Sequence, residues 1–172
     1  MRQHRRYLLI GLNLILIGWV MGWISEAAAQ VTVGDFFLGQ WGQYREINRL
    51  GREDAVAKYN YCPTGGCVLR LESVDVVPLK ARKGQTLTLI TSYTILTPEQ
   101  VAIPVTVSRE IFFQGKSLGK VKDIATRRLN GTWRQDIDFT LPDNAAPGEY
   151  SLVTKVSTGY GQEEKTVKFT VD

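Results

Sequence analysis

The chain has 172 residues, of which 44% are hydrophobic and 22% are charged, and its formal net charge is +4. A basic excess of this size gives no electrostatic reason to expect nucleic-acid binding, which relies on a dense basic surface. The chain contains two cysteines and one histidine, His4. Because histidine serves as the base in Ser-His-Asp triads and as a ligand in many metal sites, this composition argues against both.

Residues 1–29 have the pattern of an export signal. Three arginines among the first six residues precede an apolar stretch, Tyr7–Ile24, and alanines at 27–29 provide the small residues of a cleavage site. Cleavage after Ala29 would remove His4 together with a net charge of +2, and would leave 143 residues with a charge near +2. We therefore expect the rest of the chain in an extracytoplasmic location, either periplasmic or secreted.

The same apolar stretch is also long enough to raise an alternative. It has 18 residues, which is close to the minimum for a membrane-spanning helix. The arginines before it would keep its N-terminus on the cytoplasmic side. An uncleaved segment would anchor the chain in the inner membrane by residues 7–24, and only in that case do we expect membrane contact.

Residues 30–67 are expected to form an N-terminal appendage to a larger domain. Apolar side chains recur every three or four residues, as on one face of a helix, at Phe37, Trp41, Tyr44 and Ile47. Gly39, Gly42 and Gly51 each weaken a helix by up to about 1 kcal/mol, so a short helix and an irregular segment fit equally well. We favour packing of the aromatic residues onto the next domain. The alternative is a partner-binding patch made by Phe36, Phe37, Trp41 and Tyr44.

The two cysteines, Cys62 and Cys67, are separated by Pro-Thr-Gly-Gly. In an oxidising compartment two thiols this close in sequence are expected to form a disulfide, which would fix a turn. A redox pair is the functional alternative, although such pairs usually have two intervening residues, and free thiols are a third. No other cysteine or histidine follows residue 29, so we expect no metal site of this kind and no cofactor.

From Val68 onward the hydrophobic pattern has a period of two, with Arg109 as an exception on the apolar face of its segment. Such alternation is typical of strands that bury one face. Turn sequences separate the segments, and Asn130-Gly131 is a strong hairpin signal. The predicted strands are 68–77, 86–95, 103–113, 117–124, 132–141, 149–158 and 165–171. About seven strands in this length predict an all-β fold, an antiparallel sandwich over residues 68–172.

One phrase within this region adds a family resemblance. Pro147-Gly148-Glu149-Tyr150 opens a predicted strand that is followed by a glycine turn and a last strand. This resembles the Pro-Gly-x-Tyr phrase before the penultimate strand of bacterial immunoglobulin-like domains. The resemblance covers about residues 68–172 and implies an immunoglobulin-like sandwich in which Tyr150 packs near a corner. It also implies a binding, adhesion, spacer or accessory role, and it carries over no site residues.

The acidic residues offer little support for catalysis. Asp136 and Asp138 lie two residues apart on a predicted strand and therefore share its polar face, which we interpret as a solvated surface. Glu163 and Glu164 lie near a predicted glycine turn without the spacing of a calcium loop. A histidine-free hydrolase that uses a carboxylate pair is thus a remote alternative.

Taken as a whole, the sequence predicts an exported, non-enzymatic binding or assembly module of the bacterial cell envelope. Its expected partner is another envelope protein. The main alternative is a structural subunit that the apolar segment 7–24 holds in the membrane, with the sandwich projecting outside.

Overall fold

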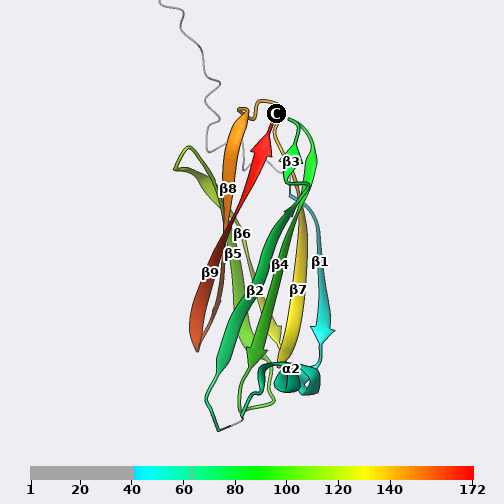
Figure 1. Cartoon of the computed structure of the whole chain (residues 1–172), viewed down its shortest axis with the longest axis vertical. Coiled ribbons are helices and arrows are strands. Elements are labelled where there is room, and N and C mark those ends of the chain that lie inside the picture. The colour runs from blue at the N-terminus through cyan, green and yellow to red at the C-terminus, as the bar shows by residue number, and fades with distance from the viewer. Residues whose placement is uncertain (1–40, 63) are drawn as a thin grey trace, which may run out of the picture.

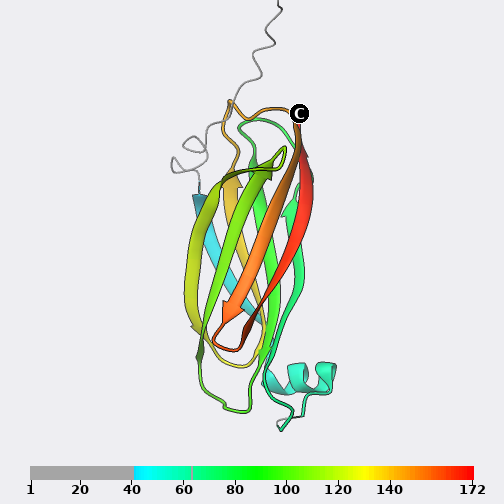
Figure 2. The same cartoon turned by 90° about the vertical axis from the view of Figure 1, so that its left-hand side faces the viewer.

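The structure is a computed structural model that describes residues 41–62 and 64–172, without the side chains of Val121 and Lys122. The described chain forms two β-sheets packed face to face, with a short helix at one end (Figures 1 and 2). The elements are β1 (Trp41–Leu50), α2 (Arg52–Tyr59), β2 (Val68–Val77), β3 (Lys80–Ala81), β4 (Thr86–Leu96), β5 (Ile103–Phe113), β6 (Lys116–Arg128), β7 (Gly131–Thr140), β8 (Gly148–Thr158) and β9 (Gly161–Val171). The predicted all-β sandwich is confirmed.

The strands divide into a four-stranded sheet, sheet A, with the order β1-β7-β4-β2, and a five-stranded sheet, sheet B, with the order β3-β9-β8-β5-β6. All pairings are antiparallel except that of the two-residue strand β3 with β9. Each of the seven strands predicted from the sequence is present, as β2 and β4 to β9. Strands β1 and β3 were not predicted.

The core lies between the sheets and is built from the inward-facing residues of each strand. Burying a Val, Leu, Ile or Phe side chain contributes about 1.5–3 kcal/mol, so a continuous apolar layer of this kind is the main source of stability. Residues with at most 1% exposure include Leu71, Leu87, Leu89, Val107, Ile111, Phe139, Leu152 and Val156. Their alternation with exposed neighbours matches the period of two in the sequence.

Tyr150 is fully buried at the start of β8, as the family resemblance implied. Its hydroxyl donates a 2.8 Å hydrogen bond to the Ala146 carbonyl, and its ring stacks on Phe169 with a centroid distance of 5.4 Å. A second ring, Phe113, lies 4.5 Å away. Gly148 has a φ of +141°, and a Cβ there would come within 3.0 Å of the Phe113 ring, so this position of the phrase requires glycine.

Within the predicted appendage, the structure corrects the expectation that the aromatic stretch around Trp41 and Tyr44 is helical or irregular. Residues Trp41–Leu50 form strand β1, which pairs with β7 and belongs to sheet A. Trp41 lies opposite Phe139 and Tyr44 opposite Ile137, and the register shifts between these two pairs. Such a bulge places residues three apart on the same face, which imitates the spacing of a helix. Within the part of the chain that the structure describes, the sandwich therefore begins at Trp41.

The helix of the described chain is α2, which lies within the predicted appendage, where a short helix was one of the two expectations, but follows the aromatic residues that suggested it. Gly51 caps its start, and Asn60, with a φ of +47°, ends it in the left-handed conformation. The helix buries Ala55 against Leu96 and Tyr61, and so closes one end of the sandwich (Figures 1 and 2). No described helix is long and apolar enough to cross a membrane. The export signal or anchor predicted within residues 1–29 lies outside the described residues.

Asn130-Gly131 does not form the predicted hairpin. It connects β6 in sheet B to β7 in sheet A, and the Asn130 side chain is 5% exposed. Its amide nitrogen donates to the carbonyls of Thr97 at 2.8 Å and Glu99 at 3.1 Å. Its oxygen accepts from the Thr97 amide and hydroxyl at 3.2 and 3.0 Å. Asn130 thus anchors the β4–β5 loop to the crossover between the sheets.

The predicted disulfide is not formed in the structure, where Cys62 and Cys67 are both exposed free thiols. The Cys62 sulfur lies 3.0 Å from the Thr64 hydroxyl, and the Gly65 amide donates a 2.7 Å hydrogen bond to the Cys62 carbonyl. The hydrogen bond to Thr64 lowers the pKa of the Cys62 thiol. The two thiols share a tight turn near α2, at the end of the sandwich that the helix closes.

Candidate functional site

A mainly apolar concavity lies between β1 and β6, the strands that end sheet A and sheet B on the same side of the sandwich. In Figure 2 β6 (yellow-green) runs in front of β1 (cyan) along this side. The concavity, which we call the β1–β6 groove, has a volume of about 370 Å³. Its lining consists of Trp41, Gly42, Tyr44, Asp123, Ile124, Ala125 and Ile137. The groove therefore joins an apolar surface to two strand edges.

Two of the four aromatic residues proposed from the sequence line this groove. The Trp41 ring stacks on Phe139 with a centroid distance of 4.4 Å and an interplanar angle of 28°. Trp41 therefore packs onto the domain, which is the interpretation that we favoured from the sequence. Tyr44 is 36% exposed and presents its ring to the groove. Strand β1 thus packs onto the domain through Trp41 and lines the groove through both Trp41 and Tyr44. Phe36 and Phe37 lie outside the described residues.

Gly42 allows β1 to approach its neighbour closely at this point. A Cβ at this position would lie 2.9 Å from the Asp138 Cβ of β7, closer than real Cβ atoms approach. Beside it, Arg45 forms a two-pronged ion pair with the Asp138 carboxylate at 3.0 and 3.1 Å. Together these contacts hold β1 against β7 and fix the wall of the β1–β6 groove.

Glu46 of β1 lies next to the groove residue Tyr44, to which it is hydrogen-bonded, and its side chain is 6% exposed. Its carboxylate accepts hydrogen bonds from the hydroxyls of Tyr44 at 2.7 Å and Tyr93 at 3.0 Å, and from the Gln135 amide at 3.1 Å. It also forms an ion pair with Arg128 of β6. Burial by itself raises the pKa of Glu46, but the donors, with Arg128 first, outweigh it and lower the pKa below its ordinary value.

The polar contacts continue into the core towards Arg109 of β5, which is 1% exposed. Its guanidinium donates to the Thr91 hydroxyl at 2.8 Å and lies 3.5 Å from the Gln135 oxygen. Burial lowers the pKa of Arg109 to about 10, which leaves the group charged at neutral pH. No carboxylate of the described residues lies within ion-pair distance of it. A chain of polar side chains thus crosses the sandwich from Arg128 to Arg109.

Sequence reasoning missed Glu46, Arg128 and the groove residues of β6. The one signal available was Arg109, a charged residue on an otherwise apolar face. A buried charge needs polar neighbours. That requirement pointed to a polar cluster inside the sheet pair, but the sequence does not reveal which strands face one another.

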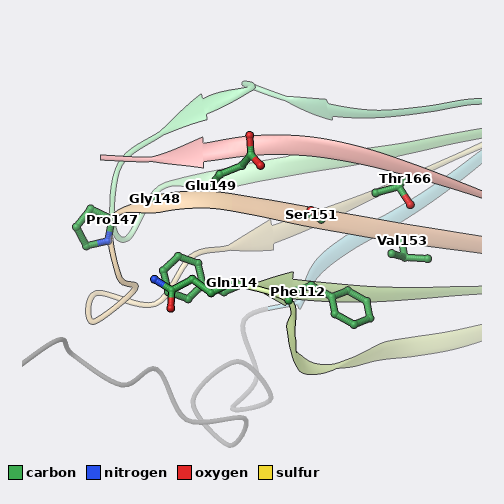
Figure 3. A pocket seen from close by; sticks show the side chains of 10 residues that line it. Phe112, Gln114, Pro147, Gly148, Glu149, Ser151, Val153 and Thr166 are labelled. Atoms are coloured by element: carbon green, nitrogen blue, oxygen red, sulfur yellow. The ribbon is translucent and has the colours of Figure 1, made fainter.

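A second concavity, of about 500 Å³, lies on the outer face of sheet B beside the β5–β6 turn. Figure 3 shows Phe112, Val153 and Thr166 from three neighbouring strands along it. Glu149 at its rim pairs with Lys168 at 2.7 Å. The surface is open and its acidic group is already paired, so it presents no arrangement for catalysis.

Three of the four carboxylates considered from the sequence, Asp136, Asp138 and Glu163, have structural partners. Asp136 pairs with Arg134 at 2.8 Å on the outer face of sheet A, where Asp138 pairs with Arg45. Glu163 accepts a 2.6 Å hydrogen bond from the Leu71 amide and so links β9 to β2. Within the described residues, no three Cys, His, Asp or Glu side chains gather as metal ligands.

No protein-family profile and no curated protein matches the sequence. Among solved structures, the CARDB domain of a Pyrococcus furiosus protein in complex with di-metal ions is similar with a TM-score of 0.43, at 13% identity over 62% of this chain and 94% of that one. An alkylpurine DNA glycosylase from Pseudomonas fluorescens, bound to DNA with an abasic site analog, gives 0.43 at 13% identity over 60% and 30%. A β-glucosidase from Listeria innocua in complex with glucose gives 0.42 at 12% identity over 61% and 16%. Likenesses this weak carry no inference about function.

Proposed function

We propose that this protein is an exported, non-enzymatic binding module that holds another protein of the bacterial cell envelope in the β1–β6 groove. The observation that carries the proposal is the groove itself. Its walls present Trp41, Tyr44 and Ile124 beside two strands that end their sheets. Concave, mainly apolar surfaces with a few polar groups are the usual binding sites of proteins.

The charged residues of the polar sheet face support a binding role over a catalytic one. Arg45 and Arg134 neutralise the carboxylates of Asp138 and Asp136 on an open face of sheet A. A hydrolase that uses two carboxylates requires them to flank a substrate in a pocket, with environments that set their pKa values apart. The geometry on sheet A is that of a solvated ion-pair network.

A second candidate is a membrane-anchored structural subunit, which the arrangement of the ends favours. Strand β1 starts, and the C-terminus lies, at the end of the sandwich opposite α2 (Figure 1). An anchor at residues 7–24 would therefore hold that end nearest the membrane and present α2 and the cysteine turn at the far end. Intact mass of the exported protein separates the candidates, because a chain that begins at Gln30 has lost the anchor and a chain that retains Met1 has kept it.

The binding proposal is tested by capture of envelope proteins with the exported protein, tagged at its C-terminus, in its native host. Ala125→Arg adds a long charged side chain at an exposed position in the lining of the β1–β6 groove, and Ala57→Arg makes the same change on the exposed face of α2. We expect a defined envelope protein to co-purify with the wild type and with Ala57→Arg, and to be lost with Ala125→Arg. Equal recovery with both variants would remove the groove as the site.

A further inference from the structure

We infer that the occupant of the β1–β6 groove is an extended peptide segment of the partner that adds to β6 as a further strand, apolar at its centre and acidic on both sides. This inference rests on the proposed function, because it takes the groove to be the partner site.

The edge of β6 has the form that strand addition requires. With 13 residues β6 is the longest strand, and it ends the order of sheet B, so no other strand of the described chain pairs with its outer edge. Between Ile124 and Arg128 its register with β5 is continuous, from Val107↔Ile124 to Ile103↔Arg128. In this regular stretch the Arg127 carbonyl accepts a 2.7 Å hydrogen bond from the Arg128 guanidinium, and an added strand would bond to the remaining backbone groups of the outer edge. Such a strand gains its affinity from main-chain hydrogen bonds.

The groove beside this edge explains why the centre of the segment is apolar. Successive side chains of an added strand point alternately to the two faces of the sheet. Those on the inner face would lie against Trp41, Tyr44 and Ile137, which form the opposite wall at the level of Ile124 and Ala125. Apolar side chains at alternate positions would remove this wall from water, and pockets for alternate side chains are what give strand addition its specificity.

The charge along β6 explains why the flanks are acidic. Lys116 and Lys120 are exposed on one side of the groove, and Arg127 is exposed on the other. Asp123 is the one acidic residue within β6. Opposite charges placed along an interface steer association and fix its register, so acidic residues on both sides of an apolar centre complement this strand.

Basic residues on edge strands also protect proteins from aggregation, and this gives the opposing explanation. The two explanations differ in what charge reversal does. If the lysines serve only as protection, their reversal changes self-association and leaves peptide binding unchanged. If they recognise an acidic segment, reversal weakens binding of that segment.

The experiment measures binding of synthetic peptides to the full exported protein by fluorescence anisotropy. The test peptide has alternating valine and phenylalanine at its centre and glutamates at both ends. A second peptide has the same sequence with N-methyl groups on the backbone amides that would face β6, and a third has lysines in place of the glutamates. We expect the first to bind and the other two to bind at least about tenfold more weakly, the change produced by about 1.4 kcal/mol.

Variants of the protein provide matched controls. Ala125→Arg should weaken the test peptide about tenfold or more, and Ala57→Arg should leave it unchanged. Lys116→Glu with Lys120→Glu should weaken it by a similar factor and reduce the dependence of binding on salt. Lys80→Glu with Arg82→Glu makes the same change of charge at β3 and the turn that follows it, and should have no effect.

Hydrogen exchange of the wild-type protein provides a measurement that needs no variant. Peptide addition should slow exchange of amides between Ile124 and Arg128, and should leave β2, the outer strand of sheet A that is remote from the groove, unchanged. Equal binding of the N-methylated peptide, or equal binding of the lysine peptide, would overturn the inference. Failure of every peptide, together with groove-dependent capture of an envelope protein, would overturn strand addition and leave the proposed function standing.

Discussion

Glu46 of β1 and Arg128 of β6 form an ion pair that joins the two sheets at the side of the sandwich that carries the groove. Backbone hydrogen bonds hold strands together within a sheet, whereas contacts between sheets depend on side chains. At this side the contact is electrostatic, and Tyr93 reaches from β4 across β7 to the same carboxylate. The ion pair therefore fixes the spacing of the strands that form the β1–β6 groove.

Glu46→Gln should lower the free energy of unfolding by about 2 kcal/mol at neutral pH, because it removes the charge from a buried hydrogen-bonded pair. The folded state lowers the pKa of Glu46 below its ordinary value of 4.5. Its contribution is therefore complete above that pH, and is lost as the pH falls through the lower pKa of the folded protein. Denaturant unfolding between neutral and acidic pH should show a smaller loss of stability on acidification in Glu46→Gln. Identical slopes in the two proteins would contradict this assignment.

Arg109→Met should raise the free energy of unfolding by about 1–3 kcal/mol, since replacing a buried charge that lacks a carboxylate partner with an apolar side chain is commonly stabilising. The guanidinium is 1% exposed, and its Nε and Nη1 atoms have no hydrogen-bond partner among the described residues. Arg109→Lys keeps the charge and loses the geometry of the bond to Thr91, so it should destabilise. Chemical denaturation of Arg109→Met and Arg109→Lys, compared with the wild type, measures both changes in the free energy of unfolding. An Arg109→Met protein that unfolds at lower denaturant concentration would show that the buried charge stabilises the sandwich.

Tyr150→Phe should lower the free energy of unfolding by about 1–3 kcal/mol. The change keeps the stacking on Phe169 and removes the hydroxyl that satisfies the Ala146 carbonyl in a buried site. Tyr160→Phe removes a hydroxyl from an exposed side chain in the β8–β9 turn and should have no measurable effect. Thermal unfolding of the two variants provides the comparison, and equal melting temperatures would contradict it.

The bond between Cys62 and Cys67 stays a prediction for the exported protein. Mass spectrometry after alkylation without reductant should show both thiols protected, since an oxidising compartment favours a bridge between thiols in the same turn. The effect on stability should be small because the closed loop is short. Modification of both cysteines in native exported protein would show instead that the turn stays reduced, and Cys62, whose pKa is lowered, should then react first.

How far the sequence predicted the fold depended on how regular each strand is. Strand β8 alternates from Glu149 to Ser157 and β4 from Thr86 to Tyr93, and their buried faces agree with the prediction there, whereas Thr94 of β4 is buried on the face predicted to be polar. Strand β1 has a bulge between Trp41 and Tyr44, which converts a period of two into a spacing of three. A local pattern therefore indicated a helix where tertiary pairing with β7 forms a strand.

The candidate site was less predictable because it is assembled from distant segments. Tyr44 and Trp41 were recognised as candidates by their residue type, but their partner residues Ile124 and Ala125 lie about 80 residues later in the sequence. Periodicity reports which face of a strand is buried and does not report which strands end their sheets. The groove depends on that order, which only the tertiary structure supplies.

Asn130 combines a chemically fragile sequence with a protected conformation. In an Asn-Gly pair the glycine backbone nitrogen attacks the asparagine side-chain carbonyl readily, because no Cβ on the glycine obstructs it, and the product is an aspartate or isoaspartate. Here four hydrogen bonds to the β4–β5 loop hold the Asn130 amide, and Gly131 is fixed at a φ of +147°. Deamidation therefore requires that this loop first detach from the crossover between the sheets. The age-dependent gain of one mass unit at Asn130 would thus record how often the α2 end of the sandwich opens in the folded protein.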